Sequence, residues 1–430
     1  MRRKQFLIPV VAAALAIGIL SIRMSAQGTI KIGVLHSLSG TMAISETTLK
    51  DTVLMLIEEQ NKKGGLLGRK LEAVVVDPAS NWPLFAEKAA QLLEKDKVSV
   101  VFGCWTSVSR KSVLPVFEKD NGLLFYPVQY EGEESSKNVI YTGAAPNQQA
   151  IPAVDYLMKD VAVKRWVLEG TDYVYPRTTN KILEAYLKSK GVADADISIN
   201  YTPFGHSDWQ TIVTDIKNFG SAGKKTAVVS TINGDANVPF YKELANQGVK
   251  AEDIPVVAFS VGEEELAGLD TSPLVGHLAA WNYFESVDSP ENKDFIDKWH
   301  AFIKNPKRVT NDPMEAHLIG FSMWVKAVEK AGTTDPDKVI DAIVGVSVPN
   351  LSGGYATMMP NHHITKPVYI GEIQANGQFE TVWQTPGLVV GDEWSDFLPD
   401  SKDLISDWRA PLTCGNFNVA TGKCGGKGTN

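Results

Sequence analysis

The stretch Val98-Ser-Val-Val-Phe-Gly-Cys-Trp-Thr-Ser107 decides the fold. It joins a short apolar run, which is typical of a buried strand, to a turn rich in polar and aromatic side chains. A helix is expected from Ser107 onward, and Pro115 is predicted to kink or end it. Such a strand–turn–helix unit is typical of a parallel sheet that is covered by helices.

Similar units lie on both sides of this stretch. From about Asp288 the chain becomes more helical, and Asn376-Gly377 predicts a hairpin. The pattern therefore predicts an α/β protein with two parallel sheets, which can hold a ligand between facing strand ends. Predicted strands cover residues 30–34, 71–76, 98–102 and 123–126 in a first series, and 166–168, 197–201, 227–230 and 256–259 in a second.

Composition limits the possible partners. The 430 residues suggest two or three domains, and 42 Lys and Arg against 50 Asp and Glu give a net charge of -8. This acidic balance argues against a nucleic-acid partner and against binding to an anionic membrane surface. The sequence also lacks the phosphate-loop, dinucleotide, nucleophile-elbow and zinc-protease motifs. We therefore predict a protein that is not an enzyme and uses no cofactor or metal.

The N-terminal residues 1–28 have the pattern of an export signal. Arg2, Arg3 and Lys4 form a basic start, residues 6–22 are mostly apolar, and Ser25-Ala26 supplies small residues for cleavage. This predicts a periplasmic protein, with an uncleaved membrane anchor as the alternative. In such an oxidising compartment, Cys414 and Cys424, which flank a Gly- and Asn-rich tail, are expected to pair.

Polar and aromatic side chains gather in the turns that follow five of the predicted strands. Because the carboxyl ends of parallel strands meet at one edge of a sheet, these turns are expected to face a cleft. The turns cover residues 35–40, 103–107, 126–132, 171–176 and 231–235. The candidate ligand-binding residues within them are Trp105, Thr106, Ser107, Tyr126, Gln129, Tyr173, Tyr175, Asn233 and Asp235.

Several of these candidates also have a purely structural interpretation. Ser107 stands where a helix begins, so its hydroxyl can contact a ligand, serve as the N-cap, or do both. The aromatic residues either face the cleft or cover the core. Asp235 either accepts hydrogen bonds from a ligand or forms the turn that starts at Asn233.

Three further groups carry side chains that could react or bind a metal. Cys104 follows an apolar run and is expected to be a buried small residue rather than a nucleophile. His362-His363 is predicted to lie in a solvated loop rather than to hold a metal. The run Glu263-Glu264-Glu265 is expected to cap and solvate the start of a helix.

Several motifs together resemble one family, the periplasmic-type amino-acid and amide receptors of ABC importers. The resemblance covers about residues 29–410 and points to the branch that holds urea-binding receptors and short-chain amide sensors. The tail with Cys414 and Cys424 is similar to that of cyanobacterial urea receptors. The motifs are residues 32–35, 61–69, 103–111, 126–132, 145–148 and 171–177.

This resemblance implies a type I periplasmic binding protein, with two Rossmann-like lobes that are joined by a three-stranded hinge and close over a ligand. It also implies ligand contacts at Ser107, Tyr126, Tyr173 and Asp235. The amide sensor has a Thr at the position of Val128, so a hydroxyl contact is lost there. The expected organisation is a signal peptide at 1–28, lobe 1 at 29–148, lobe 2 at 149–280, a return to lobe 1 at 281–352, a return to lobe 2 and hinge at 353–410, and a disulfide-tied tail at 411–430.

The ligand implied by the resemblance is urea, delivered to the permease subunits of an ABC transporter by a receptor that can act as a monomer. Urea is small and neutral, with four N–H donors and one carbonyl, so its site must offer several acceptors and a donor. The alternatives are another short amide such as acetamide or formamide, a branched-chain amino acid, an amide-sensing regulator, and an amidohydrolase that uses Cys104.

Overall fold

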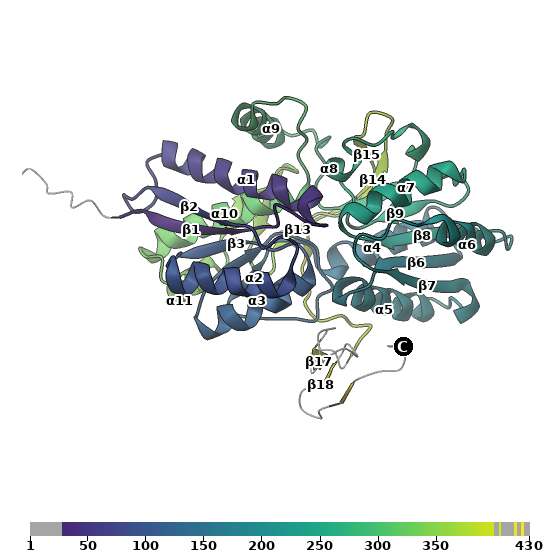
Figure 1. The fold of residues 1–430 in the computed structure, drawn as a ribbon, viewed down its shortest axis with the longest axis horizontal. Coiled ribbons are helices and arrows are strands. Elements are labelled where there is room, and N and C mark those ends of the chain that lie inside the picture. Colours follow the sequence, from purple (N-terminus) through teal and green to yellow (C-terminus); the bar gives the residue numbers. More distant parts are fainter. Residues whose placement is uncertain (1–27, 400–403, 406–416, 419–422, 425–430) are drawn as a thin grey trace, which may run out of the picture.

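The computed structural model describes residues 28–399, 404–405, 417–418 and 423–424. They form two α/β lobes that lie side by side (Figure 1). Residues 1–27 and Cys414 lie outside the described residues, so the signal peptide and the disulfide stay predictions. Within the described part of the chain, no helix combines the length and apolar character needed to cross a membrane.

Lobe 1 is built on a five-stranded parallel sheet with the order β2-β1-β3-β4-β5. All four residues of β3 are buried, as expected for a strand that is covered by helices on both faces. Its strands are β1 (Ile30–Leu35), β2 (Leu71–Val76), β3 (Val100–Gly103), β4 (Leu124–Tyr126) and β5 (Val139–Tyr141). Its helices are α1 (Ala43–Lys62), α2 (Trp82–Ala90), α3 (Ser107–Lys119), α9 (Pro290–Ile303), α10 (Asp312–Ala331) and α11 (Pro336–Ile343).

Lobe 2 contains a seven-stranded sheet with the order β15-β14-β10-β9-β8-β6-β7. Its parallel strands are β6 (Arg165–Thr171), β7 (Ile197–Thr202), β8 (Thr226–Thr231), β9 (Val256–Ala258) and β10 (Leu278–Trp281). An antiparallel hairpin of β14 (Tyr369–Ile373) and β15 (Phe379–Gln384) completes it and confirms the hairpin prediction. Its helices are α4 (Ala150–Lys159), α5 (Val174–Ser189), α6 (Gln210–Gly220), α7 (Asn237–Asn246) and the short α8 (Glu263–Leu266).

Short elements complete the described chain. They are the antiparallel pairs β11 (Ser347–Pro349) with β12 (Tyr355–Thr357) and β13 (Thr365–Lys366) with β16 (Val389–Val390), and the strands β17 (Leu404–Ile405), β18 (Phe417–Asn418) and β19 (Lys423–Cys424). Helical turns lie at Gln91–Lys95, Pro146–Gln148, Asp194–Asp196, Gly234–Ala236 and Ser272–Leu274.

Three crossovers join the lobes, and one side chain ties them together. Asn282, which follows β10 in the second crossover, donates to the carbonyl of Gln148 in the first (2.9 Å) and to that of Pro367 in the third (2.6 Å). Lys366 also donates to the carbonyl of Thr142 (2.9 Å), again linking the third crossover to the first. The three crossover segments are therefore joined to one another by hydrogen bonds, in agreement with the hinge that the resemblance implied.

Helix α3 does not end at Pro115. Of the two predicted effects of this proline, a kink or an end, the end is excluded, because the helix continues to Lys119. Val113 and Phe117 lie on either side of the proline and are fully buried in the core of lobe 1. Their burial offsets the hydrogen bond that a proline removes from a helix.

Two groups that were expected in solvent are largely buried, so the expectation of solvent exposure was wrong for both. His363 is stacked on Tyr141 with ring centroids 4.7 Å apart, and burial lowers its pKa to about 4. Glu263 and Glu265 are also buried, and Glu265 accepts a hydrogen bond from the backbone N–H of Gly262 at the start of α8 (2.9 Å). The carboxylate run therefore caps the helix but does not solvate it.

Candidate ligand site between the lobes

The strand ends of the two lobes meet at one interface. Trp105, just after β3, donates from Nε1 to Oδ1 of Asn233, just after β8 (3.2 Å). Gln129, after β4, donates from Nε2 to the hydroxyl of Ser260, after β9 (2.7 Å). All four side chains are buried. Three of the five turns that the sequence predicted to face a cleft, at residues 103–107, 126–132 and 231–235, therefore contribute to this interface.

Thr106, and not Ser107, caps helix α3. The Thr106 hydroxyl accepts a hydrogen bond from the backbone N–H of Ser109 (3.1 Å). Ser107 is the first helical residue, so the N-cap interpretation of this residue was wrong. Its hydroxyl instead donates to Oε2 of Glu131 and accepts from Nη1 of Arg110 (3.1 Å).

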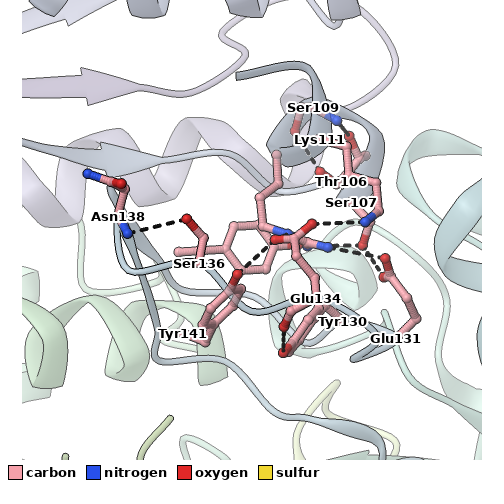
Figure 2. Close-up of polar contacts among 12 residues, drawn as sticks. Thr106, Ser107, Ser109, Lys111, Tyr130, Glu131, Glu134, Ser136, Asn138 and Tyr141 are labelled. Atoms are coloured by element: carbon pink, nitrogen blue, oxygen red, sulfur yellow. Dashed lines mark hydrogen bonds and ion pairs between the residues drawn. The ribbon is translucent and has the colours of Figure 1, made fainter. Parts of the chain in front are cut away.

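A buried cluster of charges lies behind Ser107 (Figure 2). Arg110 donates from Nη2 to Oε1 of Glu131 (3.1 Å) and from Nε to Oε1 of Glu134 (2.8 Å). Lys111 donates to the other oxygen of Glu134 (2.9 Å), and Tyr141 donates to Oε1 (2.8 Å). Two cations thus neutralise two anions inside lobe 1.

The aromatic residues around Arg110 fix its position. The guanidinium carbon lies 4.6 Å from the centre of the Tyr126 ring and 4.7 Å from that of Tyr130, a cation–π arrangement with both rings. Burial alone would raise the pKa of Glu134, but Arg110 and Lys111 lower it well below its usual value. The Glu134 carboxylate is therefore ionised at neutral pH.

Lobe 2 contributes two buried tyrosines, Tyr173 and Tyr175. Burial raises the pKa of both phenols, and the carboxylate of Glu131 in lobe 1 is close enough to raise them further. Among the described residues, neither the Tyr175 hydroxyl nor Oε1 of Gln129 has a hydrogen-bond partner by geometry. A donor and an acceptor are thus left unpaired where the lobes meet.

Asp235 does not lie among these buried side chains. Its side chain is exposed, and its backbone N–H donates to the carbonyl of Thr41 in lobe 1 (3.1 Å). The preceding Gly234 has φ of +72°, and a Cβ there would lie 2.5 Å from the Thr41 carbonyl oxygen. Asp235 therefore lies at the rim of the interface, in a tight backbone contact, rather than in the enclosure where an acceptor was expected from the sequence.

An aromatic contact covers one side of the interface. Trp82 of lobe 1 packs on Phe204 of lobe 2 with centroids 5.2 Å apart, and Phe204 packs on Tyr173 at 4.8 Å. Trp82 and Phe204 are half-buried, so they separate the enclosed tyrosines from solvent.

Cys104 lies in lobe 1 beside this site and is buried, as expected. Burial raises the pKa of its thiol, so the sulfur stays protonated at neutral pH and supplies no thiolate nucleophile. Within the described residues, no group of three or more His, Cys, Asp or Glu side chains is placed to hold a metal ion.

Eight of the nine candidate residues lie buried at or next to the interface. Trp105, Thr106, Ser107, Tyr126 and Gln129 come from lobe 1, and Tyr173, Tyr175 and Asn233 come from lobe 2. Three further residues of the interface, Arg110, Glu131 and Ser260, were not among the candidates. Glu131 lies in a turn already singled out, and Arg110 lies three residues after Ser107, one helical turn along α3.

The comparisons with known proteins agree with this architecture. A family model described as the periplasmic binding protein domain matches residues 30–400. The chain belongs to this family. A Leu/Ile/Val-binding protein homolog of Brucella melitensis is 24% identical over 367 residues, which are 84% of this chain and 91% of the relative. The leucine-, isoleucine-, valine-, threonine- and alanine-binding protein of Pseudomonas aeruginosa is 26% identical over 345 residues, 77% of this chain and 86% of the relative.

Solved structures of type I periplasmic binding proteins have the same fold. One of them is a solute-binding protein of an ABC transporter from Rhodopseudomonas palustris, in complex with p-hydroxybenzoic acid. It has a TM-score of 0.73 and 22% identity to this chain, and the match covers 85% of this chain and 98% of that protein. The branched-chain amino acid transporter protein LivJ of Streptococcus pneumoniae, in complex with isoleucine, gives 0.69 at 19% identity, with 84% and 99% covered.

Proposed function

We propose that this protein is an exported receptor that binds urea, or a closely related short amide, between its lobes and delivers it unchanged to an ABC permease. The observation that carries this proposal is the pair of unpartnered polar atoms at the interface. The Tyr175 hydroxyl can donate to a carbonyl oxygen, and Oε1 of Gln129 can accept an N–H. Urea and primary amides carry both a carbonyl oxygen and N–H groups on one carbon atom.

Closure of the lobes accounts for uptake without chemistry on the ligand. A ligand that bridges Gln129 in lobe 1 and Tyr175 in lobe 2 binds the closed state better than the open state and so shifts the equilibrium toward closure. The closed receptor then presents a single surface to the permease, and a monomer is sufficient for this. The family and the signal-like N-terminus support a periplasmic location.

A branched-chain amino acid is the second candidate, because relatives of this chain carry that specificity in their names. Such a ligand needs donors for its carboxylate, an anion for its ammonium and an apolar pocket for its side chain. In the cluster beside Ser107, however, Arg110 and Lys111 already donate to Glu131 and Glu134. Both cations of this cluster are therefore already paired, which favours a ligand without a carboxylate.

Calorimetric titration of the purified protein tests the proposal, with urea, acetamide, formamide, leucine and 4-hydroxybenzoate as ligands. We expect binding heat and a raised unfolding temperature with urea or one of the two amides. Tight binding of leucine or the aromatic acid, with no response to any neutral amide, would overturn it. Ammonia release from urea would support the amidohydrolase alternative, and a cytosolic protein with an intact N-terminus would support the regulator.

A further inference from the structure

We propose that closure of the lobes is coupled to the uptake of a proton by Glu264 and Glu265, two acidic residues of helix α8. This inference rests on the lobe closure that the proposed function requires, and it adds control of that closure by pH. The juxtaposition that carries it is a pair of acidic side chains of lobe 2 held against lobe 1, with one guanidinium, that of Arg308, beside them.

Hydrogen bonds place both acidic side chains at the boundary between the lobes, where α8 lies (Figure 1). Ser45 in α1 of lobe 1 donates from its hydroxyl to Oε1 of Glu265 (2.6 Å). Arg308, in the chain between α9 and α10 of lobe 1, donates from Nη2 to Oε1 of Glu264 (3.0 Å) and to the Thr48 hydroxyl in α1 (2.9 Å). Separation of the lobes therefore breaks these bonds and admits water to both acidic side chains.

Acidic side chains outnumber cations around α8. Glu263 is 1% exposed and accepts a hydrogen bond from the backbone N–H of Glu285 (2.7 Å), but its Oε2 has no partner among the described residues. Within the described chain, Arg308 is the only cation that forms an ion pair with Glu263, Glu264, Glu265 or Glu285. Because a buried carboxylate without a counter-ion is costly, the closed protein favours protonation within this group.

The other elements packed against α8 leave this imbalance in place. From α1 the contact is the Ser45 hydroxyl, and from the loop before α10 the backbone N–H of Thr310 donates to Oε2 of Glu285 (2.6 Å). Among the described residues, no charged side chain of α7 bonds to the acidic group. His300 in α9 is hydrogen-bonded to the carbonyl of Arg308 (2.9 Å) and, when charged, lowers the pKa of Glu285. The acidic excess remains whether or not this histidine is charged.

The closed structure therefore holds a proton that the open structure releases. Burial raises the pKa of Glu264 from 4.5 to about 7 in spite of the nearby Arg308, and burial also raises the pKa of Glu265. With the lobes apart and water around them, both groups return toward their ordinary pKa of 4.5. Proton uptake therefore favours closure fully below about pH 4.5, and this contribution is lost as the pH rises toward 7.

Protonation of Glu265 keeps its contact with lobe 1. A hydroxyl can accept a hydrogen bond as well as donate one, so a neutral Glu265 donates to the oxygen of Ser45 across the same 2.6 Å. Glutamine at this position reproduces that arrangement, because its amide N–H donates where the acid proton would. The glutamine variants therefore resemble the protonated state permanently.

Calorimetric titration tests the coupling, with whichever of urea, acetamide, formamide, leucine and 4-hydroxybenzoate binds the wild type as the probe. Titrations in two buffers of different ionisation enthalpy count the protons taken up, and titrations at about pH 5 and about pH 8 give the change in affinity. The test variants are Glu264→Gln, Glu265→Gln and the double variant. Glu169→Gln is the matched control, because Glu169 is a fully buried acidic residue that contacts Asn200 within the sheet of lobe 2 (3.2 and 3.1 Å).

We expect the wild type to take up protons on binding and to bind at least about 10-fold more tightly at about pH 5 than at about pH 8, since each unit of pKa difference between the two states corresponds to a tenfold change. Each single variant should take up fewer protons and respond less to pH, and the double variant should show neither effect. Glu169→Gln should behave as the wild type does, because its carboxyl group stays inside lobe 2 in both states.

Binding without proton uptake by the wild type, or unchanged uptake in a folded double variant, would overturn the inference and leave the proposed function intact. Proton-linked binding of leucine or 4-hydroxybenzoate alone would support the inference and overturn the proposed function. Circular dichroism shows which variants are folded, and a folded single variant carries the test if the double variant is not. If no probe binds, the proposed function fails, and equal radii of gyration of the wild type at the two pH values by X-ray scattering would overturn the coupling as well.

Discussion

At the scale of single residues, Arg110 determines the character of the site. Its guanidinium contacts two tyrosine rings and donates to two buried carboxylates, so it holds charge and geometry together. Burying charges is costly unless each has its partner, and removal of one partner leaves the other charge uncompensated. The cluster is therefore expected to tolerate the loss of this cation poorly.

Arg110→Met is expected to lower the free energy of unfolding by about 3–5 kcal/mol, because Glu131 loses its cation and Glu134 keeps only Lys111. Thermal unfolding without ligand measures this change. Lys119→Met is the control, since Lys119 and its partner Glu94 are 71% and 51% exposed, so solvent screens this pair and its loss should change stability little. Equal losses in the two variants would contradict the importance of the buried pair.

At the scale of elements, the turns after the strands set how closely the lobes approach. The turn after β8 brings the backbone of Gly234 against that of Thr41, and its positive φ suits glycine. The sequence predicted this turn and its polar residues correctly. It did not reveal that the backbone, rather than the Asp235 side chain, makes the contact with lobe 1.

Gly234→Ala is expected to weaken binding of the proposed ligand, urea, at least about 10-fold, because its methyl group would meet the Thr41 carbonyl and hold the lobes apart. Calorimetric titration measures the affinity. Gly248→Ala is a matched control, since Gly248 has φ of +67° and a methyl group there would meet nothing within 4 Å. Both variants should lose a similar small amount of stability, and an equal loss of affinity in both would contradict the steric explanation.

Strand β6 carries the buried carboxylate of Glu169, whose pKa burial raises from 4.5 to about 8. The folded protein therefore binds this proton more firmly than the unfolded chain does, so stability falls as pH rises from about 4.5 toward 8. Glu169→Gln cannot ionise. We expect the free energy of unfolding of this variant to match that of the wild type near pH 4.5. At pH 9 it should exceed the wild-type value by on the order of a few kcal/mol.

Thermal unfolding across this pH range measures the difference between the two proteins. Glu58→Gln is the control, because Glu58 is 51% exposed in its pair with Lys62 and its loss should leave the pH profile nearly unchanged. An identical pH dependence in the wild type and Glu169→Gln would show that this carboxylate does not titrate in the folded protein as its burial implies.

At the scale of the whole molecule, contacts outside the ligand site also join the lobes. Arg308 donates both to the Thr48 hydroxyl in α1 of lobe 1 (2.9 Å) and to Glu264 in α8 of lobe 2 (3.0 Å). Ser45 in α1 donates to Glu265 in α8 (2.6 Å). These bonds stabilise the closed state, so they contribute to affinity without touching the ligand.

Arg308→Met is expected to lower urea affinity about 3- to 10-fold by favouring the open state. Calorimetry measures the affinity, and small-angle X-ray scattering compares the unliganded and saturated proteins. Lys293→Met is the control, because its ion pair with Asp288 is exposed and lies within one lobe. Unchanged affinity in Arg308→Met would mean that this contact does not bias closure.

The sequence by itself determined the two βα series, the five polar turns and most residues that line the interface, because periodicity and strand-end position are local properties. Only the tertiary structure decided that Asp235 lies at the rim, that Thr106 is the cap, and that Arg110 and Glu131 pair behind Ser107. Strands β5 and β10, three and four residues long, also escaped prediction. Burial, charge pairing and the approach of two lobes join residues distant in sequence, so no local pattern encodes them.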